Sequence, residues 1–404
     1  MNLEYFISKR IALKTERTFS KLIVKIAIIG VMLSLAAMIL SVGIIKGFKS
    51  EIQSKVRGFM GDVQIYRYDL NGSFEKAPFI PNPETLNFLK THPQIAYFSA
   101  FATKPAIMIA NDEVEGVTFK GVDRDYNWSF IEKNLMEGRV IKAQDTISNP
   151  ILVSNYIAKR MKLKVGDRIL LQFVQNPPKP RKFTLIGIYN VGIEQVDQGF
   201  VLGELSMIKQ LNQWPNEYMG GIEVKLHDFK HIQEASNDIF KGLDENLRSR
   251  SILESNPEIF TWLDLLDVNT EILIVLMLIV GLINMITALL IMILEKTNMI
   301  GLLKALGARN SQIMRIFIYN ILYLVGLGLI LGNILGLGLA YLQIETKLIK
   351  LDQSNYYLDH VPVEIHWNDI LFLNLLTLGI GIIVLSLPAI LVKRISPIKA
   401  LRFK

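Results

Sequence analysis

The stretch LEKTNMIGLLKALGARN, Leu294 to Asn310, lies between two long apolar runs and decides how the rest of the fold is predicted. It is too polar to span a bilayer. Its apolar residues recur at i, i+3, i+4 and i+7, the spacing of a one-sided helix: Met299, Leu302, Leu303 and Leu306. Glycine suits the left-handed residue that ends a helix, and Gly307 stands at that position. We therefore predict a short amphipathic helix, Glu295 to Gly307, at the membrane face between two hairpinned spans.

The composition predicts a membrane protein. Of the 404 residues, 50% are hydrophobic, and the mean hydropathy is +0.32, where a soluble chain of this length usually scores below zero. Four runs are long enough to cross a bilayer and lack the polar face of a buried core helix. These runs are Ile26 to Ile45, Ile272 to Leu294, Ile316 to Leu342 and Ile370 to Val392.

Several classes of function are disfavoured. There are no cysteines, which excludes disulfides and thiolate metal sites, and the charge of +7 is clustered beside apolar runs rather than along a nucleic-acid-binding face. No phosphate loop, H-E-x-x-H or G-x-S-x-G motif occurs, so we predict no catalytic residue and no ATPase site. His227 and His231 are spaced for one helix face, but the segment is typical of a strand end and helix start, so no metal site is predicted.

Lysine and arginine near the span ends predict the topology. Basic residues flank the first run on its N-terminal side, fill the loop between the second and third runs, and follow the fourth. We therefore expect both termini in the cytoplasm and the segment between the first two spans on the far side. One set of cations runs against this pattern, because it lies just beyond the first span: Lys46, Lys49, Lys55 and Arg57.

The predicted fold is four transmembrane α-helices plus a large α+β periplasmic domain inserted between spans one and two. Residues 1–45 would hold an N-terminal interfacial helix and the first span. Residues 46–271 would form the periplasmic domain with helical stalks at both ends. Residues 272–404 would form the permease domain with three spans and the cytoplasmic helix 295–307. Alternating stretches such as Asp62 to Tyr68 predict strands, and Asn82 to Pro93 predicts a short helix.

A proline-rich stretch separates two predicted strands, Ile169 to Phe173 and Phe183 to Tyr189. Prolines stiffen a loop and cannot donate ladder hydrogen bonds. The stretch is a rigid surface turn or a projecting finger that carries basic side chains to a partner. The candidate residues are Gln175, Asn176, Pro177, Pro178, Lys179, Pro180 and Arg181.

The third run carries a GxxxGxxxG ladder at Gly328, Gly332 and Gly336. Small residues at this spacing let another helix approach closely. The partner would be span two or span four of the same chain, or a second subunit. No charged residue lies inside any run, which argues against an ion-coupled transporter or channel.

One span, a large outer domain, and three spans with an amphipathic segment after the second resemble the MacB/FtsX-type permeases of ABC systems. The segment LEKTNMIGLLKALGARNSQIMRIF resembles their signature region. Other stretches resemble the lipoprotein-releasing (Lol) branch: FISKRIALK at residues 6–14, the exit of span one, the strands around Gly166 to Gly203, and the ending SPIKALRFK at residues 396–404.

This resemblance implies a permease subunit that extracts lipoproteins from the bacterial inner membrane. Glu295, Lys296 and the apolar residues named above would form a coupling helix on a separate cytoplasmic ATPase, which would hold ATP and Mg²⁺; this chain would carry no cofactor. Further partners would be a second permease (identical or related), the lipoprotein cargo, a periplasmic carrier and membrane lipids. The proline-rich hairpin corresponds to a carrier-binding hook but is shorter. An efflux permease of MacB type and an FtsX-type regulator of cell-wall hydrolases are the alternatives.

Overall fold

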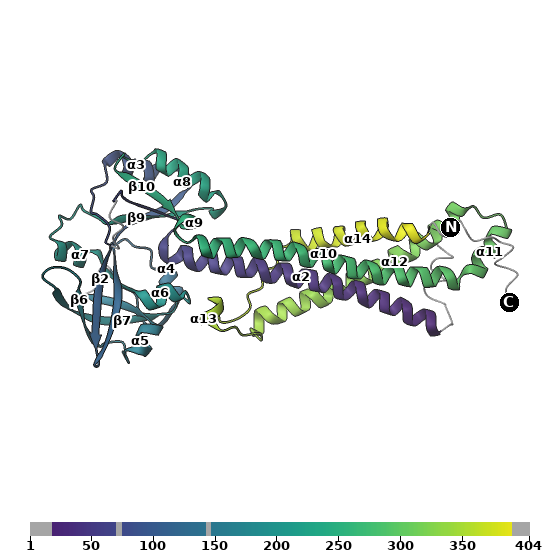
Figure 1. Ribbon diagram of the computed structural model, residues 1–404, viewed down its shortest axis with the longest axis horizontal. Coiled ribbons are helices and arrows are strands. Elements are labelled where there is room, and N and C mark those ends of the chain that lie inside the picture. The colour runs from purple at the N-terminus through teal and green to yellow at the C-terminus, as the bar shows by residue number, and fades with distance from the viewer. Residues whose placement is uncertain (1–17, 70–74, 143–146, 390–404) are drawn as a thin grey trace. The chain divides into compact units, whose positions relative to one another are not determined.

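The computed structural model describes residues 18–69, 75–142 and 147–389 (Figure 1). The predicted interfacial segment at residues 6–14 and the ending at residues 396–404 lie outside the described residues. The chain divides into two compact units. We call one the helical unit, residues 1–49, 262–350 and 360–404, and the other the sheet domain, residues 50–261 and 351–359.

Long helices build the helical unit and run alongside one another (Figure 1). They are α2 (Thr18–Met60), α10 (Pro257–Glu295), α12 (Asn310–Thr346) and α14 (Trp367–Ala389), with the short α11 (Thr297–Ala305) between α10 and α12. All four long helices are long and apolar enough to cross a membrane, which confirms the four predicted spans. Both α2 and α10 continue past their apolar runs into the residues of the sheet domain, as the predicted stalks require.

The helices bury one apolar core and leave their other faces uncovered. The core includes Leu35 of α2, Leu289 of α10, Phe317 of α12 and Leu373 of α14. Many apolar side chains of α10 are about half exposed, among them Ile272, Val275 and Ile283. In water such a surface would aggregate, so these faces suit lipid or another membrane helix.

Three of the four cations that ran against the predicted topology, Lys46, Lys49 and Arg57, have acidic partners. Lys46 Nζ lies 2.7 Å from the Asp369 carboxylate of α14, and Lys49 binds both Asp264, at 3.2 Å, and Asp267 of α10.

The described residues of the sheet domain form ten strands. They are β1 (Val63–Arg67), β2 (Ile95–Ala110), β3 (Glu113–Val122), β4 (Leu135–Gly138), β5 (Pro150–Ser154), β6 (Arg168–Phe173), β7 (Lys179–Tyr189), β8 (Phe200–Glu204), β9 (Gly221–Leu226) and β10 (Leu247–Ser251). Its helices are α3 (Pro83–Thr91), α4 (Ser129–Lys133), α5 (Asn155–Arg160), α6 (Glu194–Gly199), α7 (Leu205–Asn212), a 3-10 turn (Phe229–His231), α8 (Ile232–Lys241), α9 (Ile252–Ser255) and α13 (Gln353–Tyr356).

Strand β2 joins two parts of the sheet because it is 16 residues long. Its first half pairs with β9, which continues through β1 to β10. Its second half pairs with β3 on one side and β6 on the other, and the order β2-β3-β8-β5-β7-β6 closes a ring. The ring encloses an apolar core with Phe119, Phe173 and Phe183 in mutual contact.

Buried charges tie the end of α2 to the sheet. The fully buried Asp62 carboxylate binds Arg57 at 2.5 Å and accepts from the backbone N–H of Leu226 at 2.8 Å. Lys225 Nζ lies 3.5 Å from the same carboxylate and donates to the Arg57 carbonyl at 3.1 Å. Cations suit the carbonyl end of a helix, so this network caps α2 where it meets β1.

A second buried pair lies beside the first. Lys120 Nζ of β3 is 2.8 Å from the Glu223 carboxylate of β9, and the two side chains are 3% and 7% exposed. Lys120 also donates to the Phe59 carbonyl of α2 at 2.5 Å and lies over the Phe59 ring. The last turn of α2 is thereby held by two lysines from two different strands.

Candidate functional site

The predicted cytoplasmic helix is present as α11, with Gly307 in the left-handed conformation (φ +86°) after its end. The predicted helix, Glu295 to Gly307, is shorter in the structure. Glu295 is the last residue of α10, and α11 begins at Thr297. The half-buried Glu295 carboxylate lies 3.8 Å from Lys296 Nζ, and Met299 is half-buried.

The apolar face of α11 divides into a packed half and an open half. Ile300, which the spacing argument did not include, is fully buried, and Leu303 packs against the helical core. Leu302 is 52% exposed and Leu306 is 77% exposed. Leucines exposed four residues apart at a turn between two spans form a small apolar surface that suits a partner.

The proline-rich hairpin joins β6 to β7, and its β7 strand starts at Lys179, four residues earlier than predicted. The Asn176–Pro177 peptide bond is cis, and residues 176–178 are exposed. Pro180 and Arg181 lie in β7 and pair with β6. The Val174 N–H donates to the Pro105 carbonyl at 3.0 Å, which ties the loop to β2.

The basic side chains of the hairpin are not equivalent. Lys179 Nζ donates to the Leu211 carbonyl at 2.9 Å, at the end of α7, and so is engaged within the domain. The Arg181 guanidinium donates a hydrogen bond to the carbonyl of the neighbouring Pro180. Lys182 is exposed. Any partner would therefore meet Arg181 and Lys182 rather than Lys179.

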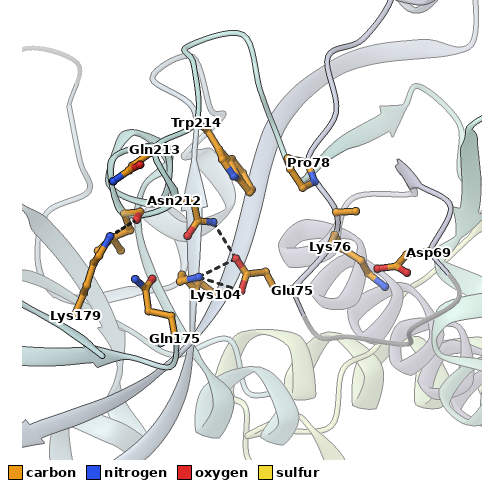
Figure 2. Close-up of a pocket in the computed structure, with 12 residues that line it drawn as sticks. Asp69, Glu75, Lys76, Pro78, Lys104, Gln175, Lys179, Asn212, Gln213 and Trp214 are labelled. Carbon is orange, nitrogen blue, oxygen red and sulfur yellow. Dashed lines mark hydrogen bonds and ion pairs between the residues drawn. The ribbon is translucent and has the colours of Figure 1, made fainter. Parts of the chain in front are cut away.

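A cleft of about 630 Å³ lies at the base of the hairpin (Figure 2). Lys104, almost fully buried, pairs with Glu75 at 2.8 Å, and Asn212 donates to the same carboxylate at 2.9 Å. Within the described part of the chain, the buried Gln175 Oε1 atom has no hydrogen-bond partner, and Trp214 forms part of the wall. This cleft was not predicted from the sequence, because its walls come from segments far apart in the chain.

The glycine ladder packs within the chain, but its partner differs from the one predicted. A Cβ at Gly328 would lie 2.6 Å from the Val31 Cβ, and one at Gly332 would lie 3.0 Å from the Met32 carbonyl oxygen. A Cβ at Gly336 would lie 3.1 Å from the Ala36 Cα. These contacts belong to span one, so the prediction of span two or four was wrong. The absence of side chains on these glycines leaves room for Val31 and Leu35 of α2 and lets the two helices approach closely.

A polar pair inside the helical unit was also missed. The Asn333 and Asn374 side-chain amides bind each other reciprocally at 2.8 and 3.0 Å, linking α12 to α14. Asparagine at spaced positions in two apolar runs was the available signal. Among the described residues, no group of three His, Asp or Glu side chains is arranged to hold a metal ion.

The architecture defines a multi-pass membrane protein with a large domain inserted after its first span. The family described as MacB-like periplasmic core domain matches residues 26–240, and the FtsX-like permease C-terminal family matches residues 271–397. Because the first match alone covers more than half of the sequence, the chain belongs to the MacB/FtsX-type permeases.

Full-length relatives carry a more specific name. The lipoprotein-releasing system transmembrane protein LolC of Xylella fastidiosa strain Temecula1 is 21% identical over 421 residues, which cover 100% of this chain and 98% of that protein. The transmembrane protein LolE of the same system in Haemophilus influenzae is 25% identical over 426 residues, covering 99% of each. The crystal structure of the periplasmic region of MacB from Actinobacillus actinomycetemcomitans is 13% identical, covers 50% of this chain and 95% of that chain, and gives a TM-score of 0.37.

Proposed function

We propose that this chain is the permease subunit of an ABC-type complex that extracts lipoproteins from the bacterial inner membrane. The observation that carries the proposal is the match to LolC and LolE proteins from one end of the chain to the other. A lipoprotein would leave the membrane through the permease and pass to a soluble periplasmic carrier. Both termini and α11 would lie in the cytoplasm, and the sheet domain in the periplasm.

In this proposal α11 is the seat of a separate ATPase, which binds ATP and Mg²⁺. The exposed Leu302 and Leu306 side chains would enter an apolar groove on that subunit, while Ile300 and Leu303 fix α11 to the spans. A change in the ATPase would then move α10 and α12 directly, because α11 connects them in the chain. The continuous helices α2 and α10 would carry the movement into the sheet domain.

A carrier would bind beside the proline-rich hairpin. The hairpin offers Arg181 and Lys182, which point to opposite faces of β7, and the adjacent cleft offers Trp214. The uncovered apolar faces of α10 suit a second permease and membrane lipids. With the glycine ladder occupied by α2, that second subunit would not bind through the ladder.

The test is depletion of the chain in its own host, followed by separation of inner and outer membranes. Lipoproteins destined for the outer membrane should accumulate in the inner membrane, and the wild-type gene should restore their sorting. The double variant Leu302→Asp/Leu306→Asp should insert normally but fail to restore sorting, whereas Asn298→Asp, an exposed change on the same helix, should succeed. Normal sorting during depletion would refute the proposal; drug sensitivity or cell chaining alone would point to an efflux permease or a regulator of cell-wall hydrolases.

A further inference from the structure

A short loop between the last two spans belongs to the sheet domain rather than to the helical unit. This loop, Leu351–Asp359, contains α13 and connects α12 to α14; we call it the strap. Its ends are held together, because the Leu351 N–H donates to the Asp359 carbonyl at 2.9 Å. A bridge between Lys350 and His360 continues this pairing outside the strap. The strap is therefore a closed loop with a defined shape.

Two hydrogen bonds dock the strap on the sheet domain. The Asn190 side-chain amide donates to Gln353 Oε1 at 3.1 Å. Lys55 Nζ, on the part of α2 within the sheet domain, donates to the Tyr357 carbonyl at 3.0 Å. Leu358 is only 3% exposed, so the strap also buries one apolar side chain.

The loop after β7 is shaped to receive the strap. Gly192 has φ +83°, and a Cβ there would lie 2.3 Å from Gln353 Nε2 and 2.9 Å from the Tyr357 carbonyl oxygen. The buried Asp197 carboxylate fixes this conformation by accepting from the N–H groups of Val191, at 3.2 Å, and Gly192, at 2.7 Å. Only glycine combines this backbone conformation with so close an approach.

The docking contact includes hydrogen bonds that can open and close. Each such bond contributes little net stability, since water replaces it when it opens. The strap is attached to α12 and α14, whereas the chain enters and leaves the main part of the sheet domain through α2 and α10. Because the strap and Lys55 are carried by different helices, a shift of α12 and α14 along α2 would act on this contact.

We propose that the strap is a reversible tie, docked on Asn190 and Gly192 in the absence of nucleotide and released when ATP moves the helices. The inference rests on the proposed function, because it requires a partner ATPase. It adds that the loop between spans three and four restrains the sheet domain until the ATPase acts.

The chain has no cysteine, so introduced thiols report on the strap alone. The double variant Asn190→Cys/Gln353→Cys, in membranes containing the whole complex, is treated with a short bis-methanethiosulfonate crosslinker that reductant cleaves. In this variant the Lys55–Tyr357 bond and the buried Leu358 still hold the docked strap. Crosslinking within the chain should be efficient without nucleotide and should fall about tenfold when the complex is trapped with ATP and vanadate, because positions 190 and 353 separate on release, a change of about 1.4 kcal/mol in the docking equilibrium. Equal crosslinking in the two states, or none in either, would overturn the tie.

The locked complex gives a second readout. Crosslinking should slow ATP hydrolysis by the complex, and reductant should restore it, while either single cysteine variant should remain unaffected. Adding Gly192→Val to the double variant should abolish crosslinking without nucleotide while leaving the complex assembled. If no ATPase copurifies with the chain, the proposed function fails; if an ATPase copurifies but crosslinking ignores nucleotide, only the tie fails.

Discussion

Removing one partner of the buried Lys120–Glu223 pair should destabilise the sheet domain far more than removing both. Lys120→Met leaves the Glu223 carboxylate, 7% exposed, without its ion-pair partner, while the Gln64 amide still donates to it at 3.1 Å. A buried charge without its counterion costs about 3–5 kcal/mol of unfolding free energy, whereas replacing a buried pair with apolar groups is often neutral. Lys120→Met/Glu223→Met should therefore recover to within about 2 kcal/mol of wild type, the remaining loss being the uncapped Phe59 carbonyl.

The assay is hydrogen exchange of the full-length chain in detergent, read on peptides from β1, β3 and β9. Exchange in these strands reports the local opening free energy without requiring the domain to be isolated. The backbone amides of these strands should exchange much faster in the single variant than in wild type. In the double variant their exchange rates should be close to those of wild type. The reasoning is refuted if Lys120→Met changes the opening free energy by less than about 1 kcal/mol, or if the two substitutions simply add.

Three further outcomes are expected. Leu302→Asp/Leu306→Asp should abolish copurification of an ATPase without changing membrane insertion, because both side chains are exposed; retention of the ATPase on pull-down would contradict this. Gly328→Ala should lower the thermal midpoint of the full chain, since its Cβ would meet Val31 at 2.6 Å at a cost of about 1–3 kcal/mol, whereas Gly338→Ala, with nothing within 4 Å, should not; equal midpoints would contradict it. Burial raises the pKa of the Asp197 carboxyl above its ordinary 3.8, so the stability it contributes is present below that value and is lost as pH rises through the raised pKa; this slope of midpoint against pH should disappear in Asp197→Asn, and an unchanged slope would contradict it.

The sequence predicted the helical unit well because length and hydropathy decide it. Spans, stalks and the short helix after span two follow from uninterrupted apolar runs and one-sided spacing. The partner of Gly332 could not be predicted, since a small-residue ladder states only that some helix comes close. Span one is the partner, and the α2 side chains that meet the ladder are mostly large ones such as Val31 and Leu35, while the small Ser34 lies against Gly281 of α10.

The sequence predicted the α+β class of the sheet domain but not its cleft or its buried ion pairs. Strand β2 was missed, because Ile95–Ala110 lacks strict alternation where it changes neighbours from β9 to β3 and β6. Lys104 and Lys120 appear in the sequence as ordinary surface lysines, and only pairing across strands buries them against Glu75 and Glu223. The strap was assigned to the permease domain because chain order, which places it between two spans, says nothing of its contacts.

The sequence could not predict which basic side chains of the hairpin are engaged within the domain. Lys179, Arg181 and Lys182 were predicted to reach a partner, yet Lys179 is engaged by the end of α7. That bond is made to the Leu211 carbonyl, 32 residues farther along the chain. Sequence spacing carries no information on such a contact. The loop between the two strands, by contrast, was predicted from its prolines.

ATP-dependent release of a labelled lipoprotein from vesicles tests the central claim most directly. The vesicles would contain this chain with the ATPase and any second permease that copurify with it, and a soluble carrier would be supplied outside. We expect the lipoprotein to pass to the carrier only when ATP and Mg²⁺ are present, and not when Leu302→Asp/Leu306→Asp replaces the wild-type chain. ATP hydrolysis by the assembled complex without any transfer of lipoprotein, or transfer by this chain with no ATPase present, would contradict the account.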